Sequence, residues 1–216
     1  MMRKTAAVLF AVLLCVTTLL AVLYTACTLP SVMTRRFAAF AQPDIPAQDH
    51  AAYAREITDY LKGASEAPAF FNARERAHMA DVRALVLLAK TLLLCAAAAA
   101  VPLGVITIRS GLRRVARRAL LASVSAVVLL TAYGAFDFGG LFTLFHQAAF
   151  SNDLWMLDPR TDMLIRLMPE PFFRAYALSC ALVFLFLCAV LYGVMTERGI
   201  RWITMNGAFK RRKPSG

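Results

Sequence analysis

Apolar residues occur along the chain in four long runs, separated by more polar segments. A helix needs about 20 predominantly apolar residues to cross the ~30 Å hydrocarbon core of a membrane. The chain is 60% hydrophobic and 17% charged, whereas about a quarter of residues are charged in a typical soluble domain. The pattern therefore predicts an all-α integral membrane protein. Its four transmembrane helices are expected at Thr5–Leu29, Ala84–Ile108, Ala119–Phe138 and Ala175–Met195.

The four segments divide one membrane domain, residues 1–216, into loops of different charge. The N-terminus, the inner loop 109–118 and the tail 196–216 together carry 13 basic residues and one acidic residue. The loops 30–83 and 139–174 together carry 10 basic and 11 acidic residues. Because basic residues favour the cytoplasmic side, we expect both termini in the cytoplasm and both long loops outside.

The net charge of +11 follows from this topology and adds attraction to anionic lipid headgroups. No basic and aromatic patch indicates a nucleic-acid partner, so none is expected. The first apolar run is longer than the about 7–15-residue core of a signal peptide, and we expect it to persist as a transmembrane helix. All five cysteines lie in the spans without metal-ligand spacing, which favours simple packing between helices.

Short helices are expected in the first outer loop. The stretch "AQDHAAYAREITDYLKG" has one apolar face and predicts an amphipathic helix that ends at Gly63, with His50 in solvent. Asn72 and Glu75 have capping-box spacing, with Phe71 before them. A helix that begins there continues into the second span, which puts His78 about 9 Å outside Ala84, near headgroup depth.

The third apolar run, 119–150, is too long for one crossing. Gly134, Asp137 and the Gly139-Gly140 pair predict a break, after which "LFTLFHQAAF" forms a short interfacial helix. This places His146 on the same membrane face as His78. Asp158 and the following proline predict the N-cap of a further short helix, Pro159–Met168.

The polar residues at this face are the candidates for chemistry. Glu75 and Asp81 flank His78 at helical spacing, so either carboxylate could orient the imidazole as a general acid or base. Each candidate also has a structural explanation, such as a solvated histidine or an interfacial anchor for Trp155. Polar groups beside hydrocarbon are costly unless they are paired, so their concentration indicates a hydrogen-bond network or a site, and we favour a site. Lys90 either snorkels outwards or pairs with Asp137.

Two segments resemble the lipoprotein intramolecular transacylases (Lit), a family of bacterial four-span membrane proteins. They are "FNARERAHMADV" (Phe71–Val82) and "FHQAAFSNDLWMLDPRTDMLIRLMPEPFF" (Phe145–Phe173), about 40 of the 216 residues. The residues 30–69 carry no motif of the family. The resemblance implies that the sn-2 acyl chain of a diacylglyceryl-modified lipoprotein cysteine moves to the α-amine of that cysteine, which gives an N-acyl lyso-lipoprotein.

The resemblance also implies His78 and His146 as the catalytic pair and diacylglyceryl lipoproteins as substrates. It places the active site at the extracytoplasmic face of the bacterial cytoplasmic membrane, in contact with membrane lipid. No cofactor or metal is expected. The supporting or substrate-positioning residues would be Asn72, Arg74, Glu75, Asp81, Asn152, Trp155, Asp158 and Asp162.

Two other functions stay open at this point. A non-enzymatic membrane protein could use the outer loops to bind a partner. A metal-dependent lipid hydrolase could use His78, His146 and an aspartate as ligands, although the sequence has no HExxH motif. The chain also lacks the GxSxG pattern of serine hydrolases, so imidazole and carboxylate groups would have to carry any chemistry.

Overall fold

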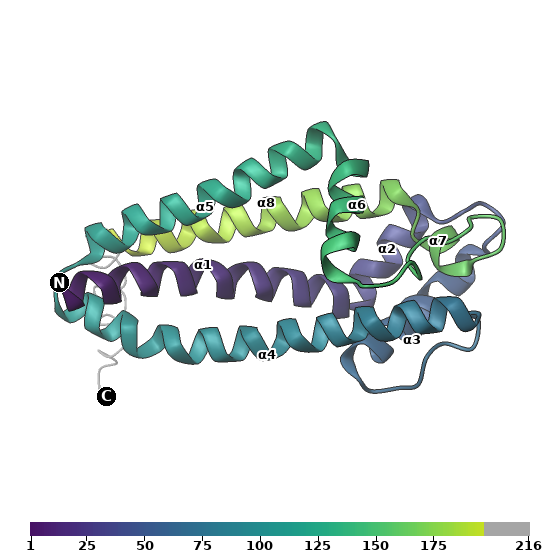
Figure 1. Cartoon of the computed structure of the whole chain (residues 1–216), viewed down its shortest axis with the longest axis horizontal. Helices are drawn as coiled ribbons and strands as arrows, with labels where there is room; N and C mark the ends of the chain where they lie inside the picture. The colour runs from purple at the N-terminus through teal and green to yellow at the C-terminus, as the bar shows by residue number, and fades with distance from the viewer. Residues whose placement is uncertain (197–216) are drawn as a thin grey trace, which may run out of the picture.

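A computed structural model describes residues 1–196, and the secondary structure of this part of the chain is entirely helical (Figure 1). The predicted cytoplasmic tail, 196–216, lies outside the described residues except for Thr196. The helices are α1 (Met2–Thr28), α2 (Pro30–Phe40), the 3₁₀ helix η1 (Ala47–Asp49), α3 (His50–Lys62), α4 (Ala73–Arg109), α5 (Arg113–Phe136), α6 (Phe138–Ala149), α7 (Met163–Leu167) and α8 (Glu170–Val194).

Four of these helices, α1, α4, α5 and α8, are long and apolar enough to cross a membrane. They coincide with the four predicted segments, so the predicted fold class is confirmed. The N-terminus and the α4–α5 connection lie at one end of the bundle (Figure 1). The opposite end carries a cap, which we define as residues 30–72 and 137–169. Apolar side chains such as Leu129, Leu94 and Phe186 are more than half exposed along the bundle, as expected of a lipid-facing surface.

The centre of the bundle is built from small side chains of α1. Ala7, Ala11 and Cys15 are buried where α1 meets its neighbours, together with Cys180 and Cys188 of α8. Small residues allow membrane helices to approach closely, because attraction between them depends on van der Waals contact. The predicted packing role is therefore confirmed for these three cysteines, whereas Cys95 is exposed.

The cap has its own core, which the sequence pattern predicted only in part. Its centre contains Phe37 of α2 and Ile57 of α3, and Phe172 at the beginning of α8 packs with them; all three are buried. The helix α3 ends at Gly63 with φ of 83°, the left-handed conformation that glycine adopts without strain, as predicted. The helix α2 was not anticipated.

The prediction that His50 is solvated was wrong. Its side chain is 6% exposed, and its ring meets the Phe37 ring edge to face at a centroid distance of 6.2 Å. His50 is the first residue of α3 and packs against α2. Because the presence of α2 was missed, the partner that covers His50 was missed too.

The long helix α4 begins as predicted. The side chain of Asn72 accepts a hydrogen bond from the backbone N–H of Glu75, and the Glu75 carboxylate accepts one from the backbone N–H of Asn72. The helix then runs without interruption to Arg109, past Pro102. His78 is therefore carried on the same rigid rod that enters the membrane.

The break between α5 and α6 is also confirmed, but the proposed Lys90–Asp137 pair is wrong. Asp137 is the N-cap of α6, and its carboxylate accepts the backbone N–H of Gly140 at 2.9 Å. Lys90 is exposed, and no ion pair joins it to Asp137 in the described part of the chain. A side chain at position 140 would place its Cβ 2.1 Å from Asp137 Oδ2, so the N-cap interaction of Asp137 requires glycine at position 140.

The predicted helix Pro159–Met168 is wrong in its start. The helix α7 comprises only Met163–Leu167, and its N-cap is Asp162 rather than Asp158. The backbone N–H groups of Thr161 and Asp162 bond to the Asp158 carbonyl in a turn. The Asp158 side chain pairs with Arg160 and does not cap a helix.

We predict that Asp137→Ala lowers the stability of the protein by about 1 kcal/mol, the usual cost of losing an N-cap acceptor. Asp137→Asn, which retains an accepting oxygen, is the matched control and should stay near the wild type. Thermal unfolding of the full chain in detergent measures both. Equal unfolding temperatures for the two variants would show that the N-cap hydrogen bond of Asp137 does not stabilise α6.

Candidate active site

The structure brings His78 of α4 and His146 of α6 together. Their ring centroids are 6.1 Å apart, with an interplanar angle of 32°. Both side chains are buried, with exposed fractions of 6% and 7%. The two residues are 68 positions apart in the sequence, so the pair exists only because α6 runs across the bundle from the end of α5 toward α4 (Figure 1).

The ring of His146 is held in one orientation by its own helix. Its Nδ1 lies 2.7 Å from the carbonyl oxygen of Phe142, one turn earlier. Because a carbonyl oxygen can only accept, Nδ1 must carry the proton, which leaves the Nε2 lone pair of the neutral ring free. No described residue is hydrogen bonded to Nε2.

Aromatic rings enclose His146 on several sides. Trp155 lies at a centroid distance of 4.9 Å, and Phe142, Phe145 and Phe150 lie at 4.0, 5.2 and 5.6 Å. Trp155, which was predicted to belong to the site, therefore packs directly against the ring of His146. The three phenylalanines were missed, although Phe142, His146 and Phe150 have the four-residue spacing that places side chains on one face of a helix.

His78 lies in a drier setting. The edge of its ring meets Phe150 at 5.2 Å, and its Nδ1 is buried without a hydrogen-bond partner among the described residues. Burial, reinforced by the nearby His146, lowers the pKa of His78 to about 4, although Asp81 acts in the opposite direction. Burial also lowers the pKa of His146, against the effect of its bond to the Phe142 backbone. Both imidazoles are therefore neutral near pH 7.

Glu75 does not contact His78 as a hydrogen-bond partner. Its side chain is 1% exposed, and its two carboxylate oxygens accept the backbone N–H groups of Asn72 at 2.7 Å and Leu164 at 2.5 Å. Leu164 is in the first turn of α7. Glu75 thus joins the beginning of α4 to the beginning of α7, and supports the site as a scaffold.

Asn72 and Asp162 extend the same scaffold. The Asn72 side chain donates from Nδ2 to Asp162 Oδ1 at 2.8 Å. The other carboxylate oxygen of Asp162, a residue that is 6% exposed, accepts the backbone N–H of Asp158 at 2.8 Å. Both residues therefore fix the course of the segment 158–164 beside α4.

Two further bonds fasten the segment 150–157 to α4. Asn152 donates from Nδ2 to Asp81 Oδ2 at 3.0 Å, and its own oxygen accepts the backbone N–H of Leu154. Arg74 donates to the backbone carbonyl of Asp153 at 2.6 Å. Asp81 therefore influences the charge around His78 while it is hydrogen bonded to Asn152.

Asp158 lies apart from the histidines. Its carboxylate forms a 2.7 Å ion pair with Arg160, and the Arg160 side chain is 85% exposed. The hydrogen bonds from Arg160 lower the pKa of Asp158 to about 2. The side chain therefore shapes a surface turn, and only its backbone joins the network through Asp162. Within residues 1–196, no group of three or more His, Cys, Asp and Glu side chains is arranged to hold a metal ion.

Comparison with known proteins gives a consistent answer. A sequence model of the family described as lipoprotein intramolecular transacylase Lit matches residues 5–173. A solved structure of the membrane-integral Lit of Bacillus cereus has a TM-score of 0.74 at 20% identity, and the match covers 91% of this chain and 97% of that one. No curated protein sequence matches significantly.

Two mutated forms of the same Bacillus cereus protein have similar structures. A form with a histidine-to-alanine mutation has a TM-score of 0.71 at 19% identity, covering 91% of this chain and 94% of that one. A form with a histidine-to-arginine mutation has a TM-score of 0.59 at 19% identity, covering 95% and 92%. At these identities the structural likeness concerns the fold.

We predict that Glu75→Ala destabilises the protein by about 2 kcal/mol or more, because hydrogen bonds to charged groups contribute roughly 1.5–3 kcal/mol. Arg76→Ala, an exposed position on the same turn, is the control and should change little. Thermal unfolding of the full chain in detergent measures the difference. If both variants unfold at the wild-type temperature, Glu75 does not hold the two segments together.

We also predict that stability falls as the pH is lowered from about 6.5 to about 4. The unfolded chain binds a proton at His78 near the usual pKa of 6.5, whereas the folded chain resists protonation until about pH 4. Between these values the unfolded state binds more protons, so stability decreases with decreasing pH. Unfolding temperatures over this range should fall less steeply for His78→Gln. Parallel curves for the variant and the wild type would contradict the assignment.

Proposed function

The chain belongs to the lipoprotein intramolecular transacylase (Lit) family, and from this premise we propose that His78 and His146 carry out its acyl transfer. The protein is accordingly an enzyme that transfers an acyl group within a lipoprotein substrate. The observation that supports the proposal most directly is the meeting of two buried imidazoles, 6.1 Å apart, inside a ring of aromatic side chains.

The substrate in this proposal is a diacylglyceryl-modified lipoprotein, and the transferred group is its sn-2 acyl chain. The acceptor is the α-amine of the same cysteine, so donor and acceptor are held on one molecule. We place the site at the extracytoplasmic face of the bacterial cytoplasmic membrane. The clustered arginines of the 109–118 connection support this orientation, because that connection lies at the end of the bundle opposite α6, the helix of His146 (Figure 1).

His146 is the proposed base. An α-amine has a pKa of about 7.7–8.0 and is mostly protonated at neutral pH, so it must lose a proton before or during attack. The bond from Nδ1 to the Phe142 carbonyl leaves Nε2 of His146 as the atom that can accept a proton. Transfer of that proton to the departing glyceryl oxygen then returns His146 to its neutral form.

His78 is the proposed donor to the oxyanion. Its lowered pKa keeps the ring neutral, so it polarises the ester carbonyl by an N–H hydrogen bond and not as an imidazolium. A neutral imidazole can serve this purpose when the donor is fixed in a dry site. Asp81, which acts electrostatically on His78, favours the build-up of positive charge on that ring as the oxyanion forms.

The bonds balance in a single sequence. The amine nitrogen adds to the ester carbonyl carbon, and the tetrahedral intermediate then loses the glyceryl oxygen. A C–N amide bond replaces a C–O ester bond. The protonated amine loses two protons in all: one moves through His146 to the new hydroxyl, and the other is released to water. Because both reacting groups belong to one molecule, orientation supplies much of the rate enhancement.

The aromatic enclosure has a separate task in this proposal. Water competes with the amine for an activated ester, and its attack would release a free fatty acid. Rings around both imidazoles, including Trp155 and Phe150, limit the space for water beside them. Exclusion of water also strengthens hydrogen bonds to developing charge. The Asn152–Asp81 and Arg74–Asp153 bonds position this wall against α4.

We predict that His78→Ala and His146→Ala each reduce formation of the lyso-lipoprotein by about 100-fold or more, the usual contribution of a general acid or base. Arg160→Ala, an exposed change in the same cap, should retain activity. Mass spectrometry of the N-terminal peptide of a reporter lipoprotein, in a host without other N-acylation, measures the product at matched protein levels.

Two outcomes would contradict the proposal. Wild-type activity in either histidine variant would remove that residue from the mechanism, and activity lost on chelation would indicate the metal-dependent alternative. An intact fold in the inactive variants should be verified by thermal unfolding, so that loss of chemistry is separated from loss of structure.

A further inference from the structure

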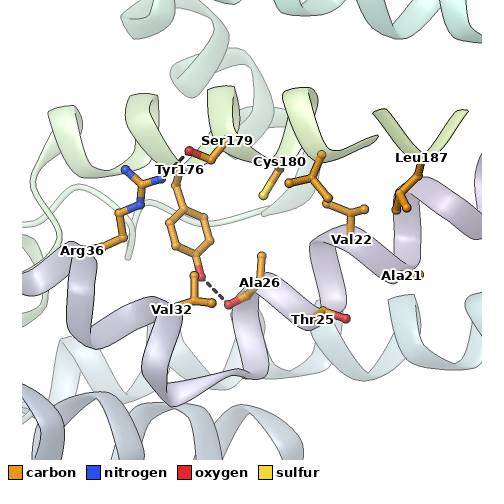
Figure 2. A pocket seen from close by; sticks show the side chains of 11 residues that line it. Ala21, Val22, Thr25, Ala26, Val32, Arg36, Tyr176, Ser179, Cys180 and Leu187 are labelled. Atoms are coloured by element: carbon orange, nitrogen blue, oxygen red, sulfur yellow. Dashed lines mark hydrogen bonds between the residues drawn. The ribbon is translucent and has the colours of Figure 1, made fainter. Parts of the chain in front are cut away.

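A second feature, separate from the histidines, is an apolar groove of about 320 Å³ between α1 and α8. Its walls include Ala21 and Val22 of α1 and Cys180 and Leu187 of α8 (Figure 2). Val183 of α8 also lines it. We propose that this groove binds one acyl chain of an anionic glycerophospholipid, whose phosphate is held by Arg36 at the end of the groove nearest the cap.

The dimensions of the groove fit a chain from one leaflet. Its lining runs along α8 from Tyr176 to Leu187, which corresponds to ~16 Å along the helix axis at 1.5 Å per residue. This is about half of the ~30 Å hydrocarbon thickness. The small side chains of Ala21 and Ala26 on α1 leave room opposite α8 (Figure 2).

The polar end of the groove is built around a cation. The Arg36 guanidinium donates to Ser179 Oγ and lies over the Tyr176 ring at 5.9 Å (Figure 2). Tyr176 is fixed in turn by its hydroxyl, which donates to the carbonyl of Ala26. The arginine is therefore held against α8 at the mouth of the groove, and Tyr176 links that wall to α1.

Arg36 has no acidic partner among residues 1–196. Its side chain is half-buried, and only one of its hydrogen-bond donors is used by Ser179. A guanidinium is well matched to a phosphate, which can accept several of its N–H groups at once. The remaining N–H donors of Arg36 can therefore bind an anion at the mouth of the groove, where an acyl chain would enter.

The charge separates this lipid from the lipoprotein substrate. A diacylglyceryl cysteine has an uncharged glyceryl group and a cationic α-amine, so it offers no anion to Arg36. A phospholipid offers a phosphodiester directly above its acyl chains. The groove also involves α1, α2 and α8 and none of the two histidines, so its occupancy does not depend on the mechanism proposed above.

Titration of the purified full chain in detergent tests the proposal, with native mass spectrometry and thermal unfolding as readouts. Phosphatidylglycerol should bind one per protein and raise the unfolding temperature. Diacylglycerol with the same chains should bind at least about tenfold more weakly, since the charge-assisted hydrogen bonds from Arg36 to the phosphate are lost. Inorganic phosphate alone should have no effect.

Paired variants locate the lipid. Arg36→Gln should weaken phosphatidylglycerol binding by about tenfold or more, whereas Arg35→Gln, an exposed neighbour, should not. Val183→Trp should fill the groove and prevent binding, whereas Leu182→Trp, which lies outside the lining, should leave it unchanged. His146→Ala should bind the lipid normally, which separates this test from the test of catalysis.

Several results would overturn the inference. Equal binding of phosphatidylglycerol and diacylglycerol, or equal effects of the two arginine variants, would exclude recognition of the phosphate by Arg36. Stabilisation by inorganic phosphate alone would indicate a simple anion site. Displacement of the phospholipid by a diacylglyceryl lipopeptide would assign the groove to the substrate.

Discussion

The buried carboxylate of Glu75 is the interaction on which the geometry of the site most depends. It bonds to two backbone N–H groups, one before α4 and one in α7, and so fixes where the long helix begins relative to the cap. His78 follows one turn later on the same helix. An apolar residue in place of Glu75 would leave the N–H of Leu164 buried without an acceptor, which is costlier than losing a surface bond. The same residue thus serves folding and function.

The sequence predicted the features that depend on local rules. The four spans follow from apolar length, the start of α4 from the Asn72 and Glu75 spacing, and the break before α6 from Asp137 and its glycines. These rules involve residues a few positions apart. The adjacency of His78 and His146 was inferred from topology, which could give a common membrane depth but not a distance.

The features that the sequence did not predict depend on distant partners. His50 was expected in solvent because the α2 helix that covers it was not foreseen. The helix after Asp158 was placed too early, because the side chain that accepts a backbone N–H in the first turn of α7 is Glu75, 89 residues before Leu164 in the sequence. The rings around His146 looked like ordinary apolar residues of an interfacial helix. Only their positions in space identify them as walls of a site.

Asp137, the N-cap residue of α6, limits how this sequence can change. The Asp137 carboxylate occupies the space that any side chain at position 140 would need. A substitution at Gly140 alone therefore displaces the acceptor that begins the helix of His146, and a substitution at Asp137 alone leaves a glycine in the first turn of that helix with no structural purpose. The two positions constrain each other, so related sequences should keep both residues or replace both together. Covariation of positions 137 and 140 would then reflect the space that the Asp137 carboxylate occupies beside Gly140.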